Sequence, residues 1–172
     1  MKFSALRSAD NPASAFLGPK DFHWLIPGRL GGAPRPGIGF AHDIQGDLDA
    51  LLRVNTKLLV NLTEECNPPR HLLEAVGLDS YHHKIPDMGA PNLADAVETC
   101  RLVDRYLTEG KACVFHCHGG KGRTGTMLAA QLIFYGLDAD NAIAQTREQN
   151  AKWIESQRQF DFLYLFSEYT SQ

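Results

Sequence analysis

The chain has 172 residues, of which 44% are hydrophobic and 22% are charged. This is the composition of one ordinary globular domain, and it excludes a disordered tail, a coiled-coil rod and a miniprotein held by disulfides. The formal net charge of −3 argues against a general nucleic-acid binder, which usually carries a basic excess. We therefore expect no nucleic-acid partner, and we expect any bound anion to be held by a local cluster of residues.

The start of the chain does not read as a targeting segment. Residues 1–20 mix Ser, Ala, Asn and Pro, which predicts an extended lead-in to one catalytic domain over residues 21–172. The longest uncharged apolar stretch, residues 124–137, is too short to span a bilayer. The four cysteines have irregular spacing, unlike an extracellular disulfide framework. We expect a cytoplasmic, reduced monomer with no integral membrane segment.

Short apolar runs alternate with longer segments of helical periodicity. Residues 22–30 predict a strand, a turn at Pro27-Gly28 and a second short strand, and the Gly- and Pro-rich residues 31–46 predict a long loop. Further strands are predicted at residues 57–62, 81–85 and 112–115. Helices are predicted at residues 48–54, 68–76, 92–107, 124–135, 138–149 and 155–169.

This alternation predicts an α/β fold with a central, mainly parallel sheet of four to five strands flanked by helices. Such sheets bind ligands just beyond the carboxyl ends of their strands. The predicted strand at residues 112–115 is followed by a polar, glycine-rich segment and then by an apolar helix. That segment is therefore the place to look for a functional site.

Residues 116–125 read His-Cys-His-Gly-Gly-Lys-Gly-Arg-Thr-Gly. Gly119, Gly120 and Gly122 allow the backbone to curl so that successive N–H groups face one centre, and the following helix adds the partial positive charge of its N-terminus. Arg123 supplies a planar fork that matches two phosphate oxygens. The segment therefore predicts a cradle for an oxyanion such as phosphate.

Two residues could supply chemistry at this cradle. Cys117 lies at its base, where positive potential favours the thiolate, a nucleophile aimed at phosphorus. Asp87, in a proline-flanked loop after a predicted strand, could protonate a leaving group, or it could simply form a turn. A nucleotide-binding P-loop is excluded because Phe115 and Gly122 stand where that motif needs Gly and Ser or Thr. A glycine-rich turn around a core cysteine is the structural alternative.

Residues 116–125 resemble the signature loop of cysteine-based protein tyrosine phosphatases. Most of the chain is similar to small, single-domain atypical dual-specificity phosphatases, on matching pieces at residues 24–30, 58–65, 85–87 and 122–128. The resemblance covers about residues 22–168. It implies a phosphatase domain with the signature loop between the last core strand and a helix, working through a phosphocysteine intermediate without metal or cofactor.

The resemblance also implies a role for each matching residue. Cys117 would form the phosphocysteine, and Arg123 would bind the phosphate and the transition state. Asp87 would act as the general acid and then as the base for water. Thr124 would donate its hydroxyl to the departing thiolate, and His116 would hold the loop without touching substrate.

Other residues leave the substrate open. Glu155 stands where larger relatives place a water-orienting glutamine, so its role is undecided, and Gln159 is expected to be structural. His118 and Lys121 add positive charge to the loop, which suits a phosphoinositide head group or only attracts anions at the surface. The main expectation is a phosphorylated protein or peptide carrying phosphotyrosine, with phosphoserine and phosphothreonine also open.

Three alternatives to a protein phosphatase remain. A phosphoinositide or an RNA 5′ phosphate could be the substrate of the same mechanism, and the chain could be a phosphate-binding pseudophosphatase. A zinc site is disfavoured because His82 and His83 would point to opposite faces of a strand, and because a metal on Cys117 would silence the nucleophile. No metal is therefore expected.

Overall fold

The computed structural model describes residues 18–38 and 43–172, so all but the last three residues of the predicted lead-in lie outside the described residues. The elements, in chain order, are β1 (His23–Ile26), β2 (Leu30–Pro34), α2 (Ile44–Arg53), β3 (Thr56–Thr63), α3 (Arg70–Ala75), β4 (Asp79–Ile85), α4 (Leu93–Thr108), β5 (Ala112–Cys117), α5 (Gly122–Phe134), α6 (Ala139–Gln149) and α7 (Gln157–Thr170).

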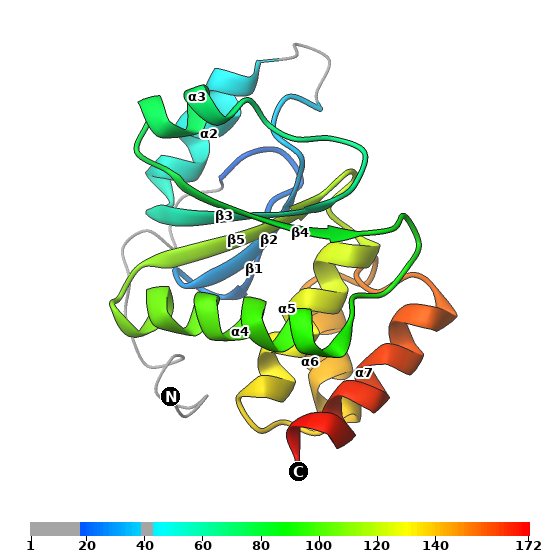
Figure 1. Ribbon diagram of the computed structural model, residues 1–172. Helices are drawn as coiled ribbons and strands as arrows, with labels where there is room; N and C mark the ends of the chain where they lie inside the picture. Colours follow the sequence, from blue (N-terminus) through cyan, green and yellow to red (C-terminus); the bar gives the residue numbers. More distant parts are fainter. Residues whose placement is uncertain (1–17, 39–42) are drawn as a thin grey trace.

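The strands form one five-stranded sheet in the order β1-β2-β5-β3-β4, which confirms the predicted α/β class (Figure 1). Only the edge strand β1 runs antiparallel to its neighbour; β2, β5, β3 and β4 are parallel. Strand β5 is central and is buried along its whole length. Because its carboxyl end lies in the middle of one sheet edge, Cys117 and the loop after it open between the flanking strands.

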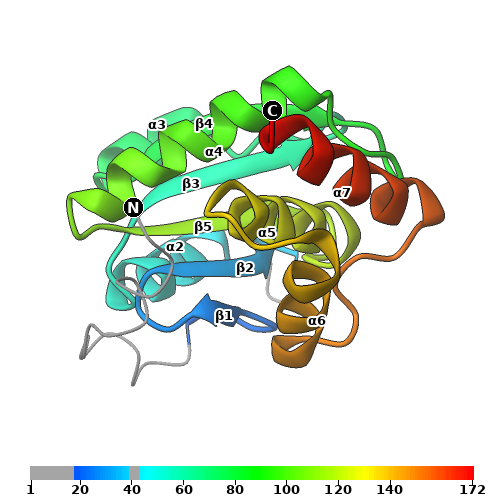
Figure 2. The ribbon, with the colours of Figure 1, turned by 90° about the horizontal axis from the view of Figure 1, so that it is seen from below.

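Helices cover both faces of the sheet. Helices α2 and α3 lie on one face, and α4, α5, α6 and α7 lie on the other (Figure 1). Figure 2 shows α5 enclosed by the other helices of its layer, and α4, α6 and α7 all contact it. All residues of α5 from Gly122 to Ile133 are buried, which explains why its sequence has no polar face. Among the described helices, none has the length and apolarity needed to cross a bilayer.

The predicted long loop over residues 31–46 is wrong at both ends. Residues 31–34 continue β2, and α2 begins at Ile44, while residues 39–42 lie outside the described residues. The glycines here serve close packing: a Cβ on Gly32 would lie 2.6 Å from Cγ2 of Thr124 and 3.0 Å from the ring of Trp153. A strand glycine that allows another element to approach is easily misread as a turn signal.

The predicted helix starts hold with small shifts. Asn92 caps α4 by accepting hydrogen bonds from the amides of residues 94 and 95, as its sequence position suggested. Helix α7 begins at Gln157, later than predicted, because Ser156 and Gln159 form a reciprocal capping box at its start. Glu155 therefore lies in the turn before the helix, free to face the edge of the sheet.

Candidate active site

Cys117 lies at the floor of a cleft at the carboxyl edge of the sheet. It is the last residue of β5, and its exposure is only 3%. The cleft has a volume of about 740 Å³ and is lined by the loops after β3, β4 and β5 and by the turn before α7. The hydroxyl of the buried Thr124 donates a hydrogen bond of 3.1 Å to Sγ of Cys117. The structure thus places these two predicted residues together.

The carbonyl groups of the loop are held by groups around it. The carbonyl of His118 accepts from the amide of Arg35 at 3.2 Å, and that of Gly120 accepts from the indole of Trp153 at 3.0 Å. The carbonyls of Lys121 and Gly122 are bonded within α5. In a trans peptide the N–H of the next residue points away from the carbonyl. The amides of residues 119 and 121–123 therefore point away from these anchors, the arrangement that an oxyanion cradle requires.

Gly120 is required by the geometry of this loop. Its φ of +67° is costly for other residues, and a Cβ there would come within 2.5 Å of the backbone of Ala33 and Pro34. A Cβ on Gly119 would meet only open space. Close packing of the loop against the end of β2 is therefore what fixes Gly120.

Arg123 lies beside Cys117 in the cleft and is held there by hydrogen bonds. Its side chain is 2% exposed, and its Nη1 donates to the carbonyl of Ile85 at 3.1 Å. Both terminal nitrogens also donate to the carboxylate of Glu65, at 2.9 and 2.6 Å. This bidentate pair lowers the pKa of Glu65 to about 2, because Arg123 stabilises the charged carboxylate. The guanidinium is thereby fixed in a single orientation before any ligand arrives.

Glu65 is a residue of the cleft for which the sequence predicted no role. It lies just after β3, the strand beside β5, so its position at the carboxyl edge of the sheet was a usable signal. The missing information was which of the acidic residues after that strand faces Arg123. Glu64 and Glu65 are adjacent, and only the folded loop distinguishes them.

Asp87 reaches the cleft on an anchored loop. Its Oδ1 lies 3.3 Å from Nη2 of Arg123, while its side chain stays 78% exposed. Ser156 Oγ donates to the carbonyl of Met88 at 2.8 Å, and Gln159 Nε2 donates to that of Gly89 at 3.1 Å. The start of α7 therefore holds the loop that carries Asp87, and the structural role expected of Gln159 has a concrete form.

Glu155 forms a hydrogen bond with the backbone of the loop that follows Cys117. Its Oε2 accepts a hydrogen bond of 2.9 Å from the amide of Gly122. Gln159 Oε1 accepts from the backbone amides of Glu155 and Ser156, at 2.8 and 3.1 Å, which sets the turn. A carboxylate of the chain thus stands where an oxygen of a bound oxyanion would seek a donor.

The three remaining loop residues divide between core and surface. His116 is fully buried, and burial lowers its pKa to about 4, so the ring is neutral at pH 7. Neither of its ring nitrogens has a hydrogen-bond partner within the described residues. His118 and Lys121 are exposed at the rim. In the same part of the chain, no group of three or more His, Cys, Asp or Glu side chains could hold a metal ion.

Among the described residues, carboxylates outnumber Lys and Arg around the cleft. Its charged lining residues are Glu64, Glu65, Asp87, Glu155, Lys121 and Arg123. The extra positive charge that His118 and Lys121 suggested in the sequence is therefore offset by acidic groups from other loops.

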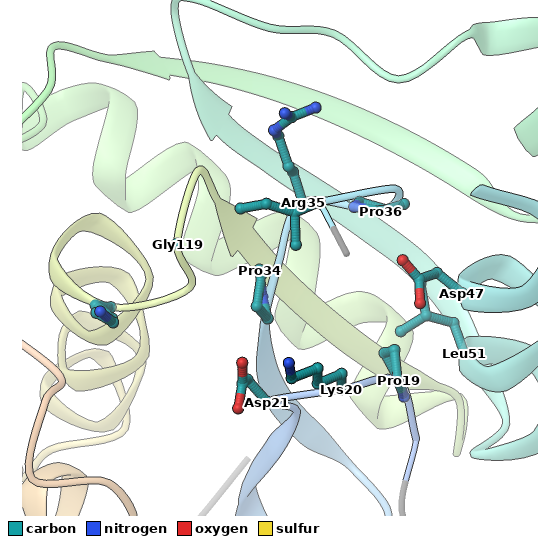
Figure 3. Close-up of a pocket in the computed structure, with 11 residues that line it drawn as sticks. Pro19, Lys20, Asp21, Pro34, Arg35, Pro36, Asp47, Leu51 and Gly119 are labelled. Carbon is teal, nitrogen blue, oxygen red and sulfur yellow. The ribbon is translucent and has the colours of Figure 1, made fainter. Parts of the chain in front are cut away.

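A second cavity adjoins the other side of the loop. It has a volume of about 510 Å³ and lies between the segment leading into β1, the end of β2 and α2 (Figure 3). Its charged lining residues within the described part of the chain are Lys20, Arg35, Lys121, Asp21 and Asp47. Gly119 and Lys121 line both cavities, so the loop is a shared wall.

Comparisons with known proteins agree with this geometry. Residues 32–137, more than half of the chain, match the family described as "Polymorphic toxin system, DSP-PTPase phosphatase". Cyclin-dependent kinase inhibitor 3 of Sus scrofa is 31% identical over 99 residues, which are 55% of this chain and 46% of that protein. Protein tyrosine phosphatase domain-containing protein 1 of Mus musculus is 34% identical over 92 residues, 53% of this chain and 12% of that protein.

A solved structure resembles the fold over most of the chain. The crystal structure of Tk-PTP in its active form superposes with a TM-score of 0.76 and 28% sequence identity, over 87% of this chain and 97% of the other. The chain spans less than half the length of the two relatives named above. The family match includes β5, the loop with Cys117 and Arg123, and helix α5. The chain therefore belongs to the DSP-PTPase phosphatase family, within the cysteine-based protein tyrosine phosphatases.

Proposed function

We propose that residues 21–172 form a metal-independent phosphatase domain that hydrolyses phosphomonoesters on phosphorylated proteins through a phosphocysteine intermediate. The observation that carries this proposal is the position of Sγ of Cys117 at the floor of the cleft, beside a buried guanidinium and 3.1 Å from the Thr124 hydroxyl. Such a floor stabilises both a thiolate and the oxyanion that faces it. The family membership supports the same reaction class.

In the first step, the thiolate of Cys117 attacks phosphorus opposite the ester oxygen. The P–S bond forms as the P–O bond to the leaving group breaks, and Asp87 gives its proton to the departing oxygen. Arg123 and the loop amides receive the charge on the equatorial oxygens. Glu65 keeps the guanidinium in place, so little reorganisation is needed during the reaction.

In the second step, water hydrolyses the phosphocysteine. The Asp87 carboxylate accepts a proton from the water, whose oxygen attacks phosphorus as the P–S bond breaks. The leaving thiolate is stabilised by the Thr124 hydroxyl, and inorganic phosphate is released. The enzyme returns to its starting state, with the thiolate restored and Asp87 protonated.

The proposed substrate is a phosphorylated protein carrying phosphotyrosine, with phosphoserine and phosphothreonine as further candidates. A nucleophilic thiol persists in a reducing compartment, so we propose a cytoplasmic enzyme. All four cysteines are unpaired in the structure, which is consistent with that setting. A monomeric state is part of the same proposal.

Hydrolysis of an aryl phosphate such as para-nitrophenyl phosphate tests the proposal. We expect turnover that is blocked by vanadate, unaffected by a metal chelator and absent from the Cys117→Ser variant. A protein that binds phosphate without turnover would instead be a pseudophosphatase. Activity that survives in the Cys117→Ser variant would refute the mechanism.

A further inference from the structure

We infer that the catalytic cleft selects phosphopeptides in which a basic side chain flanks the phosphorylated residue. The inference rests on the proposed function, because it names the substrate class of the same site. It concerns the cavity of about 740 Å³ that already contains Cys117 and the oxyanion cradle.

Acidic side chains reach this cavity from three separate parts of the chain. Glu64 and Glu65 come from the loop after β3, Asp87 from the loop after β4, and Glu155 from the turn before α7. The sheet and the start of α7 bring these segments together around Cys117. The negative charge is therefore distributed around the opening through which the substrate must enter.

These carboxylates differ in how far the chain itself neutralises them. Glu65 is fully engaged with Arg123 through two hydrogen bonds. Glu64 is exposed and forms no ion pair with any described residue. Among the same residues, the carboxylate of Glu155 has the amide of Gly122 as its one hydrogen-bond partner. Glu64 and Glu155 thus lack a cationic partner, and both line the cleft.

A phosphate that enters the cleft adds further negative charge beside these groups. Like charges in a partly desolvated site repel each other, and a complementary charge on the partner relieves the repulsion. An arginine or lysine next to the phosphorylated residue would pair with Glu64 or Glu155 at the rim. An aspartate at the same place, or further phosphates on an inositol ring, would increase the repulsion.

Matched phosphotyrosine peptides test this inference. The peptides differ only in the residues just before and after the phosphotyrosine, which are arginine in one and aspartate in the other. For the wild-type chain at low ionic strength we expect kcat/KM to favour the arginine peptide about tenfold, with a smaller ratio at high salt. A water-soluble phosphoinositide and para-nitrophenyl phosphate complete the panel.

Single substitutions test whether Glu64 and Glu155 cause the preference for the arginine peptide. Glu64→Gln and Glu155→Gln each remove one rim charge with little change of shape, and we expect each to lower the arginine-to-aspartate ratio about threefold. Glu168→Gln is the matched control: it makes the same change of net charge at an exposed position near the other end of α7 and should leave the ratio unchanged.

Each outcome bears on one claim. Turnover of the aryl phosphate with equal peptide rates, with a preference for the aspartate peptide or with faster phosphoinositide hydrolysis would overturn the inference and leave the phosphatase assignment intact. A ratio that falls equally in the Glu168→Gln control would also overturn it, because total charge and not the rim would be responsible. Absence of turnover on every substrate would refute the proposed function itself.

Discussion

Two cavities lie on either side of the loop of residues 117–123 and differ in the charge of their lining residues. The proposed chemistry belongs to the more acidic of the two. The cleft around Cys117 contains the proposed nucleophile although, among the described residues, carboxylates outnumber Lys and Arg in its lining. Among the described residues, the adjoining cavity is lined by more cationic than acidic side chains, and no cysteine lines it. We therefore propose that anion binding in the cleft depends on positioned amides and one oriented guanidinium, and not on surplus positive charge. This agrees with a chain whose formal net charge is −3.

The largest difference between the two cavities is expected when Cys117, the proposed nucleophile, is substituted. Replacing Cys117 by serine removes the thiolate, so we expect the turnover of para-nitrophenyl phosphate to fall by roughly four orders of magnitude or more. Lys20→Ala, in the adjoining cavity, should change the rate less than about twofold, as is usual for an exposed side chain outside the chemistry. Steady-state kinetics on both variants checks this. Comparable losses of turnover in the two variants would contradict the proposal that only the cleft around Cys117 carries out the reaction.

A matched pair of arginines sharpens the comparison. Arg123→Lys replaces a bidentate fork by a point charge and leaves Glu65 without its partner, so we expect about a 10³-fold loss of kcat/KM. Arg35→Lys keeps the backbone amide that holds the carbonyl of His118, and we expect less than about a threefold loss. An equal loss of kcat/KM in the two variants would contradict this account, because it would show that the Arg35 side chain contributes to phosphate binding as much as Arg123 does.

The general acid is expected to give a smaller effect that depends on the substrate. Asp87→Asn should lower kcat about 10²-fold for an alkyl phosphate and much less for an aryl phosphate, whose leaving group needs little protonation. Asp21→Asn in the adjoining cavity is the control, because asparagine tolerates the positive φ of that residue. Equal losses on both substrates would contradict the assignment of Asp87.

Stability should respond to acid through His116, on the strand that carries the shared loop. The folded protein holds this ring neutral, with its pKa lowered from 6.5 to about 4, whereas the unfolded chain binds a proton below about 6.5. The contribution is therefore present above pH 6.5 and is lost as the pH falls toward 4.

At pH 5 this loss amounts to about 2 kcal/mol. Urea denaturation at pH 7 and pH 5 should show that the free energy of unfolding falls less in a His116→Asn variant than in the wild type. An identical pH dependence in the two proteins would contradict this account of His116.

The sequence predicted the fold class and the central loop well, because both depend on local patterns. Alternating apolar runs and helical segments gave the parallel sheet, and residues 116–125 identified the edge where the cleft lies. Gly31 and Gly32 were misread as loop residues, since the Thr124 and Trp153 side chains that crowd Gly32 are distant in the sequence.

The wider site was less accessible from sequence. Glu65 pairs with an arginine 58 positions away, and nothing local distinguishes it from Glu64. The acidic rim likewise arises only when three loops converge, so charge counted along the chain near His118 and Lys121 suggested the opposite surplus. The Glu65–Arg123 pair and the acidic lining of the cleft depend on contacts between residues that are far apart in the sequence, so residue type alone does not predict them.

Direct detection of the phosphocysteine tests the central claim. The wild-type chain would be quenched in acid during turnover of an aryl phosphate, digested and analysed by mass spectrometry. We predict one added phosphoryl group on the peptide containing Cys117, and none on that peptide in the Cys117→Ser variant. Steady turnover with no phosphorylated cysteine, or with the phosphoryl group on another residue, would contradict the account.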